Sequence, residues 1–174
     1  MDNNLAIIYL SIFVGLLLIA SVSVFRQVLK SRKMESTMSR LRKKLTKEKG
    51  TSQEYYELAS IYSEKKLFSQ AITIFQKAIK AAEEEGEENV AYIYNGLGYA
   101  YFGQEQYDLA IRNYKEALKS KPDYVTALNN LGHAYERKKL NAQALEAYEE
   151  ALKLQPTNTT AKRRSDSLRR LVSA

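Results

Sequence analysis

Cysteine and tryptophan are absent from the 174-residue sequence, and histidine occurs only once, at His133. Without cysteine there are no disulfides, no thiolate metal ligands and no cysteine nucleophile. A single histidine argues against a zinc site and against a Ser-His-Asp triad. Proline occurs twice and glycine seven times, which is too few for the many turns of an all-β protein. A largely helical chain is therefore predicted.

The sequence also has no glycine-rich phosphate loop and no pairing of a nucleophile with a general base. The acidic run 83–88 lacks the spaced oxygen ligands of a calcium loop, so it is interpreted as a solvated turn. We therefore expect a protein that is not an enzyme and that uses no cofactor and no metal.

Positive charge is concentrated in two segments of the chain. Of the net charge of +7, residues 26–50 contribute +8 and residues 159–174 contribute +4, whereas residues 51–158 carry −4. Because this central part is mildly acidic, a basic face for nucleic acid is not expected there.

An uncharged run extends over Leu5–Phe25. As a helix it would be ~31 Å long, which matches the hydrocarbon core of a bilayer. A cleavable signal peptide is the alternative, but it would have a basic start and a shorter apolar core. Here the segment Asp2–Asn4, with no basic side chain, precedes the run. Residues 1–25 are therefore predicted to be a short tail and a retained transmembrane helix.

A basic juxtamembrane segment, residues 26–50, follows this run. Since basic residues flank the cytoplasmic ends of transmembrane helices, the rest of the chain is expected on the cytoplasmic or stromal side. An apolar stripe at helical spacing predicts that the segment is a helix, and it consists of Met34, Met38, Leu41 and Leu45. Three roles fit such a helix: contact with anionic lipid headgroups, a solvated connector, or packing on the domain that follows.

A pattern of small and aromatic residues recurs in the central part of the chain. One copy consists of Tyr94, Leu97, Gly98, Tyr101, Ala110, Tyr114, Ala117 and Pro122, and the next copy repeats the same spacing from Leu128 to Pro156. A less complete copy begins at Tyr55, with Ala59 in the glycine position and no closing proline. The interval from Tyr55 to Tyr94 is five residues longer than the interval from Tyr94 to Leu128. The additional five residues are placed in the acidic run.

This pattern resembles the tetratricopeptide repeat, a helix–turn–helix unit of about 34 residues. The resemblance implies an all-α fold in which the N-terminal transmembrane helix is followed by an α-solenoid of three helix pairs and a capping helix. The repeats are placed at 51–84, 91–124 and 125–158, and the basic capping helix at 159–174. The implied scaffold positions are Leu58, Tyr62, Ala71, Leu97, Gly98, Tyr101, Ala110, Pro122, Leu131, Gly132, Tyr135, Ala144 and Pro156.

Local signals support this placement. Gly98 and Gly132 have no Cβ, so the two helices of a pair can approach closely. Thr51 with a glutamate three residues later predicts a capping box, and Asp123 and Asn158 are predicted N-caps. The last helix is expected to bury Ala161, Leu168, Leu171 and Val172 and to leave Arg163, Arg164, Arg169 and Arg170 in solvent.

The first helices of the three repeats are expected to line a concave face that binds a protein partner. Its predicted contact residues are Tyr56, Tyr92, Asn95, Tyr99, Phe102, Asn129, His133 and Arg137, with Ser60, Ser63 and Thr126 beside them. Aromatic residues beside amides are typical of peptide-binding surfaces; the alternative is that some of these rings pack between repeats. His133 is expected to be a half-exposed polar residue without a special role.

Chaperone-binding members of the repeat family grip a C-terminal carboxylate with a clamp of Lys, Asn and Arg. The resemblance places Tyr56 and Ser60 where that clamp needs Lys and Asn. An adaptor for chaperone tails is therefore not expected.

The layout of the whole chain resembles the small membrane-anchored tetratricopeptide proteins of cyanobacteria and of red-lineage or glaucophyte plastids. That family is associated with assembly or stabilisation of photosystem I at the thylakoid membrane. The resemblance implies a single-pass membrane protein whose client is a subunit of a membrane complex or a co-assembly factor. Two other classes stay open: a mitochondrial import-receptor-like protein and a bacterial envelope-assembly scaffold.

Overall fold

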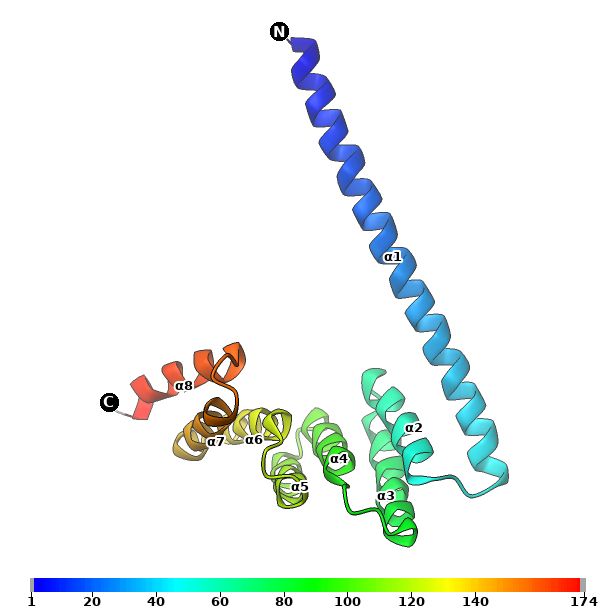
Figure 1. Ribbon diagram of the computed structural model, residues 1–174, viewed down its shortest axis with the longest axis vertical. Helices are drawn as coiled ribbons and strands as arrows, with labels where there is room; N and C mark the ends of the chain where they lie inside the picture. Colours follow the sequence, from blue (N-terminus) through cyan, green and yellow to red (C-terminus); the bar gives the residue numbers. More distant parts are fainter. Residues whose placement is uncertain (1, 173–174) are drawn as a thin grey trace. The chain divides into compact units, whose positions relative to one another are not determined.

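The computed structural model describes the backbone of residues 2–172 and the side chains of residues 8–171. This part of the chain contains eight α-helices and no strand. They are α1 (Asp2–Lys47), α2 (Ser52–Glu64), α3 (Phe68–Glu85), α4 (Ala91–Gly103), α5 (Tyr107–Ser120), α6 (Val125–Arg137), α7 (Asn141–Leu154) and α8 (Thr159–Val172) (Figure 1). The all-α prediction is confirmed. The chain divides between Lys43 and Lys44 into two compact units.

The first unit is a single uninterrupted helix that contains both the apolar run and most of the basic segment. From Ile8 to Leu29 all of its large apolar side chains are exposed. Among the described residues, Ile8–Lys47 is the one helical stretch that is long and apolar enough to cross a membrane. Exposed apolar surface of this extent is typical of a segment that contacts lipid or another protein.

The second unit consists of three helix pairs, α2/α3, α4/α5 and α6/α7, followed by α8 (Figure 1). Each helix packs on the next one along the chain. The apolar side chain of Leu45, which precedes α2, packs against the core of the first pair. Stacking of neighbouring pairs buries the apolar faces that one pair alone would expose.

The two helices of each pair are joined by the same tight turn. One residue in each turn is left-handed although it is not glycine, namely Lys66 (φ 59°), Glu105 (φ 61°) and Lys139 (φ 60°). The amide of the following residue donates a hydrogen bond to the carbonyl five residues earlier, as Leu140 does to Tyr135 at 2.9 Å. These bonds satisfy the last carbonyls of the first helix, which is the Schellman arrangement.

The helices of a pair approach closely at the predicted glycines. A Cβ on Gly98 would meet the ring of Tyr114 at 2.7 Å, and a Cβ on Gly132 would meet the ring of Tyr148 at 2.8 Å. Both rings come from the second helix of the pair and are almost fully buried. The close approach predicted at the two glycines is confirmed. Most other core positions are small: Ala59, Ala71, Ala78, Ala110, Ala117, Ala144 and Ala151.

Two of the three predicted helix starts are confirmed. The Thr51 hydroxyl accepts a hydrogen bond from the Glu54 amide and the Glu54 carboxylate accepts one from the Thr51 amide, both at 3.2 Å. Asn158 accepts a hydrogen bond from the Ala161 amide at 3.0 Å. The prediction at Asp123 is wrong, because α6 begins two residues later and its N-cap side chain makes no capping hydrogen bond.

The C-terminal helix α8 covers the end of the third pair. Ala161 and Leu168 are buried in one cluster with Ala151 of α7, as predicted. Leu171 is 63% exposed, so its predicted burial is wrong. The buried stripe of α8 consists of Ala161, Ser165 and Leu168, and Leu171 lies about a quarter turn away from it around the helix. The side chain of Val172 lies outside the described residues.

Candidate functional site

A groove is formed by the first helices of all three pairs and has a cavity volume of about 410 Å³. It is lined by Ser60, Ser63, Glu64, Phe75, Asn95, Gly96, Tyr99, Thr126 and Asn130. We call this surface the first-helix groove. Its lining contains one carboxylate and neither Lys nor Arg, so it has no cationic group that could grip a C-terminal carboxylate.

The floor of the groove is apolar and its rim is aromatic. Phe75 is only 1% exposed, and its ring lies 2.6 Å from the position that a Cβ on Gly96 would occupy. Glycine is therefore needed at this position to leave room for the ring. Tyr99 is 48% exposed, and its ring makes an edge contact with Phe68 at a centroid distance of 6.3 Å. A groove lined by one buried and one exposed aromatic ring suits an apolar side chain of a bound segment.

Polar groups cross the groove and link its helices. The side-chain amide of Asn130 donates a 3.0 Å hydrogen bond to Oδ1 of Asn95, which joins α6 to α4. The Oγ of Ser63, also in the lining, is buried without a hydrogen-bond partner among the described residues. A buried unpaired polar group costs about 1–3 kcal/mol. A bound peptide group that pairs with this hydroxyl would recover part of that cost.

Two of the predicted contact residues, Asn95 and Tyr99, line the groove, whereas Tyr56 and Tyr92 pack on each other. Their rings meet edge to face with centroids 4.6 Å apart. The Tyr92 hydroxyl also donates a 3.0 Å hydrogen bond to Glu87. Burial, followed by this hydrogen bond, raises the pKa of Tyr92 to about 12. For Tyr56 and Tyr92 the structure therefore shows the alternative, in which aromatic rings pack between repeats.

The acidic run 83–88 forms the last turn of α3 and the largely exposed turn after it, as predicted, and it also contacts the start of α2. The amide of Ser52 donates a 3.0 Å hydrogen bond to Glu85, and its hydroxyl donates a 2.9 Å hydrogen bond to Glu87. Lys49 forms an ion pair with Glu84. Carboxylates are favoured at a helix N-terminus, where backbone amides lack acceptors and the helix dipole is positive.

Three further predicted residues, Phe102, His133 and Arg137, lie together. The rings of Phe102 and His133 stack with centroids 6.2 Å apart and an interplanar angle of 10°. The Arg137 guanidinium lies 5.9 Å from the centre of the Phe102 ring. On α6, His133 and Arg137 continue the stripe begun by Thr126 and Asn130, because the spacings are four, three and four residues. The three residues therefore extend the face that carries the groove.

His133 is held by the capping helix. Its Nε2 lies 3.0 Å from Nη2 of Arg164. Arg164 also pairs with Glu136 at 3.2 Å, so the prediction that this arginine is simply solvated is wrong. Burial, followed by the positive charge of Arg164, lowers the pKa of His133 below its ordinary value. The last predicted residue, Asn129, has a buried Oδ1 without a hydrogen-bond partner in the described chain and is not part of the groove lining.

Four groove residues are not predicted by the sequence analysis: Glu64, Phe75, Gly96 and Asn130. Asn130 had a usable signal, since it lies four residues after Thr126 on the same face of the helix. Phe75 belongs to a scaffold position of a second helix, and nothing in the pattern indicates that its ring reaches the groove.

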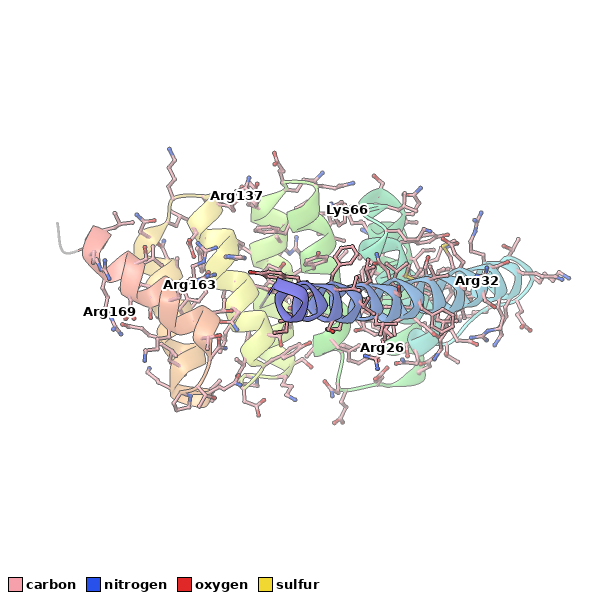
Figure 2. The ribbon with its side chains drawn as sticks, turned by 90° about the horizontal axis from the view of Figure 1, so that it is seen from above. Arg26, Arg32, Lys66, Arg137, Arg163 and Arg169 are labelled. Carbon is pink, nitrogen blue, oxygen red and sulfur yellow. The ribbon has the colours of Figure 1, made fainter. Side chains whose placement is uncertain are left out.

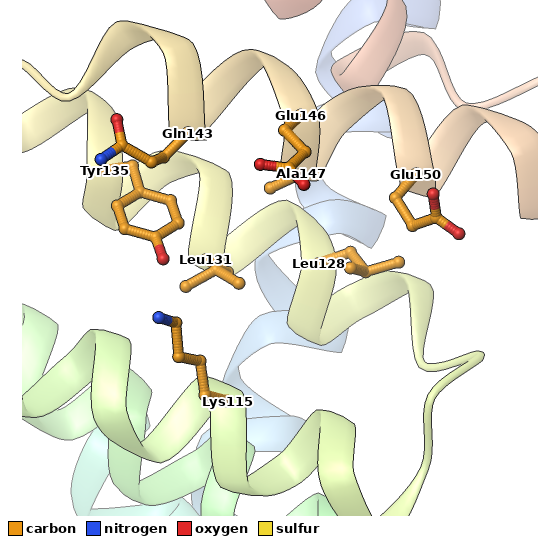
Figure 3. A pocket seen from close by; sticks show the side chains of 8 residues that line it. All are labelled: Lys115, Leu128, Leu131, Tyr135, Gln143, Glu146, Ala147 and Glu150. Atoms are coloured by element: carbon orange, nitrogen blue, oxygen red, sulfur yellow. The ribbon is translucent and has the colours of Figure 1, made fainter.

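A second cavity, of about 360 Å³, lies among α5, α6 and α7 (Figure 3). It is lined by Lys115, Leu128, Leu131, Tyr135, Gln143, Glu146, Ala147 and Glu150. Leu131 and Tyr135 lie on the opposite side of α6 from Asn130 and Arg137, since one residue advances a helix by about 100°. This cavity therefore faces away from the first-helix groove, and none of the predicted contact residues lies in it. Within the described part of the chain, no group of three or more His, Cys, Asp or Glu residues is placed to hold a metal ion.

Comparison with known sequences identifies relatives of the chain. Two family models described as tetratricopeptide repeat match residues 52–123 and 95–159. The uncharacterized protein ycf37 of Cyanophora paradoxa is 44% identical over 128 residues, which cover 73% of each chain. The chloroplastic tetratricopeptide repeat domain-containing protein PYG7 of Arabidopsis thaliana is 34% identical over 126 residues, which cover 72% of this chain and 42% of PYG7.

Solved structures with the same arrangement of helices have low sequence identity. MamA superimposes with a TM-score of 0.72 at 21% identity, covering 80% of this chain and 78% of MamA. The first TPR of Spaghetti (RPAP3), bound to the HSP90 peptide SRMEEVD, gives a TM-score of 0.66 at 18% identity, covering 73% of this chain and 97% of that one. At such identities the likeness concerns the fold alone.

The sequence matches establish more than the fold. The repeat models together span the three helix pairs, and the match to ycf37 extends over nearly three-quarters of both proteins. The chain therefore belongs to the tetratricopeptide-repeat proteins, a family of non-enzymatic protein-binding scaffolds, and it is homologous to ycf37 and to PYG7.

Proposed function

We propose that this protein is a membrane-anchored interaction scaffold that assists assembly or stabilisation of photosystem I at the thylakoid membrane. The observation that carries the proposal is the first-helix groove, which is lined by the exposed ring of Tyr99 and the buried ring of Phe75. The groove belongs to a chain that also contains an exposed apolar helix of bilayer length. A scaffold of this design holds a client segment close to the membrane surface.

The proposed anchor is the apolar part of α1. The basic residues that follow it favour placement of the repeats on the stromal or cytoplasmic side. Each Lys or Arg near an anionic surface adds about 1 kcal/mol of attraction, so the basic part of α1 is also proposed to contact lipid headgroups. Confinement near the membrane raises the effective concentration of the groove for membrane clients without any additional contact.

Two observations support the photosystem as the destination. The layout of anchor, basic segment and three repeats resembles the membrane-anchored plastid and cyanobacterial proteins associated with photosystem I. The homologue PYG7 is described as chloroplastic. The client is then a photosystem I subunit or another assembly factor, held as a short segment in the groove.

A chaperone tail is not the proposed client. The RPAP3 domain of similar fold is bound to the HSP90 peptide SRMEEVD, which is acidic. In this chain the first-helix groove has no cationic lining residue and contributes Glu64. A terminal carboxylate placed there would face a like charge.

The test replaces Tyr99 by alanine in the full-length protein, expressed in photosynthetic cells from which the endogenous gene has been deleted. Truncation of an aromatic anchor in an interface typically costs about 2 kcal/mol, or roughly thirtyfold in affinity. We expect the amount of photosystem I in the cells to fall, while the amount of photosystem II stays nearly unchanged. Leu154→Ala is the matched control, because Leu154 is 44% exposed but does not line the groove. Normal photosystem I in the Tyr99→Ala cells, at an equal level of folded protein, would refute the proposal.

A further inference from the structure

Three arginines gather where α8 meets the third helix pair. Arg137 ends α6, and Arg163 and Arg164 lie in the first half of α8; Figure 2 labels Arg137 and Arg163. The Arg137 guanidinium lies 4.9 Å from the centre of the Tyr107 ring, and Arg164 lies 3.0 Å from Nε2 of His133. We call these three residues the arginine cluster.

His133, which contacts the arginine cluster through Arg164, is neutral. A guanidinium can only donate hydrogen bonds, so the contact with Arg164 requires Nε2 of His133 to be the acceptor, which leaves the ring proton on Nδ1. The imidazole therefore carries no charge, and it neither adds to nor compensates the positive charge of the arginines. The lowered pKa of His133, caused by burial and then by Arg164, agrees with this geometry.

Carboxylates compensate the arginines only in part. Glu136 accepts hydrogen bonds from Arg164 at 3.2 Å and from the Tyr148 hydroxyl at 2.6 Å. Glu105 is 3.5 Å from Arg137, and its side chain is 75% exposed, which makes this a weak surface pair. Arg163 is exposed and has no ion pair with any described residue. The cluster thus keeps guanidinium donors available for an additional acceptor.

The cluster and the first-helix groove belong to one continuous face. Asn130 of the groove and Arg137 of the cluster lie on the same stripe of α6, seven residues or about 10 Å apart. An extended segment needs about three residues to cover that distance. The groove lining offers no cation and one carboxylate, Glu64, whereas the cluster is cationic. The charge along this face therefore changes from acidic to basic.

We propose that the arginine cluster binds the carboxylate side chain of an acidic residue in the client, about three residues from the side chain that occupies the groove. This inference rests on the proposed function, since it assumes that the groove holds a client segment. Guanidinium and carboxylate form strong, charge-assisted hydrogen bonds, frequently in bidentate geometry. The acceptor is an internal side chain, and this distinguishes the site from a clamp for a free C-terminus.

The test measures binding of two fluorescent peptides to the full-length protein in uncharged detergent micelles. Both are N-acetylated and C-amidated; one carries Glu residues about three positions from a single Leu, and the other has Gln in place of every Glu. We expect the Glu peptide to bind about tenfold more tightly at low salt, which corresponds to about 1.4 kcal/mol, because hydrogen bonds between a guanidinium and a carboxylate are charge-assisted. The difference should shrink as salt is added.

Two pairs of substitutions locate the effect. The Arg137→Gln, Arg163→Gln variant should bind both peptides equally, whereas Lys119→Gln, Lys153→Gln removes the same charge from α5 and α7 and should preserve the difference. Tyr99→Ala should lower the affinity for both peptides by the same factor and leave the ratio of the two affinities unchanged. An error in the proposed role of the groove can therefore be distinguished from an error in the proposed role of the arginine cluster. Equal affinity of the two peptides for the unaltered protein, or no binding of either, would overturn the proposal. Binding of the same variants to anionic vesicles is measured in parallel. If the arginine substitutions weaken only vesicle binding and leave peptide binding unchanged, the proposal is also overturned.

Discussion

The hydroxyl of Tyr92 donates a 3.0 Å hydrogen bond to the carboxylate of Glu87, which also accepts a hydrogen bond from the Ser52 hydroxyl. One glutamate thus connects α4 to the start of α2. Tyr92→Phe removes only the hydroxyl and should lower the free energy of unfolding by about 1 kcal/mol. Urea unfolding followed by circular dichroism measures this change.

Tyr99→Phe is the control for that measurement, because the Tyr99 hydroxyl has no hydrogen bond within the described chain. It should leave the unfolding midpoint unchanged. Equal effects of the two substitutions would mean that the bond to Glu87 contributes nothing to stability.

Gly98 is predicted to tolerate no larger residue. Because a Cβ there would lie 2.7 Å from the Tyr114 ring, Gly98→Ala should push α4 and α5 apart and cost about 1–3 kcal/mol. Thermal unfolding of the full-length protein tests this expectation. Gly15→Ala is the matched control, since a Cβ at Gly15 meets no atom within 4 Å. An unchanged melting temperature in Gly98→Ala would contradict the observed packing.

The left-handed turn residues offer a route to higher stability. Glu105 and Lys139 adopt φ values of 61° and 60°, which cost a residue with a Cβ roughly 1–2 kcal/mol. Glu105→Gly and Lys139→Gly should each stabilise the protein by about 0.5–1 kcal/mol, because part of the gain is offset by the greater entropy of glycine in the unfolded chain. Alanine at the same positions retains the Cβ and should give no such gain. A lower unfolding midpoint for both glycine variants would exclude strain at these turns.

His133 is predicted to make stability depend on pH. Its pKa is lower in the folded protein than the ordinary value of 6.5, so the unfolded chain binds the proton more readily. Stability from this residue is fully present above pH 6.5, decreases as pH falls below it, and levels off once the pH is below the folded-state pKa. In His133→Gln this contribution should be missing. Hydrogen exchange of α8 amides between pH 7 and pH 5 would show it, and identical pH profiles for the two proteins would argue against the contact with Arg164.

The architecture was predictable because its determinants recur along the chain. Gly98 and Gly132 stand one repeat length apart in matching contexts, and the capping box at Thr51 needs only two residues in the correct spacing. Asp123 shows where local signals fail. Its side chain suits a cap, but the turn after α5 extends to Tyr124 before α6 begins, and helix boundaries depend on such tertiary details.

The candidate site was only partly predictable. The helical stripe identifies Asn95 and Tyr99, but it cannot separate Tyr99 from Tyr56 and Tyr92, which are also tyrosines on the predicted face. What distinguishes Tyr92 is Glu87, part of an insertion that has no counterpart in the other repeats. The partnership of His133 with Arg164 spans 31 residues and depends on how α8 docks, which the periodicity of a single helix does not determine.

Site-specific photocrosslinking in thylakoid membranes tests whether the first-helix groove holds a photosystem I subunit or an assembly factor. A photoreactive phenylalanine analogue replaces Tyr99 in one full-length variant and Leu154 in another. We expect a crosslink from position 99 to a photosystem I subunit or a photosystem I assembly factor, and none of these from position 154. The same crosslinks from both positions, or crosslinks from position 99 only to proteins unrelated to photosystem I, would contradict this expectation.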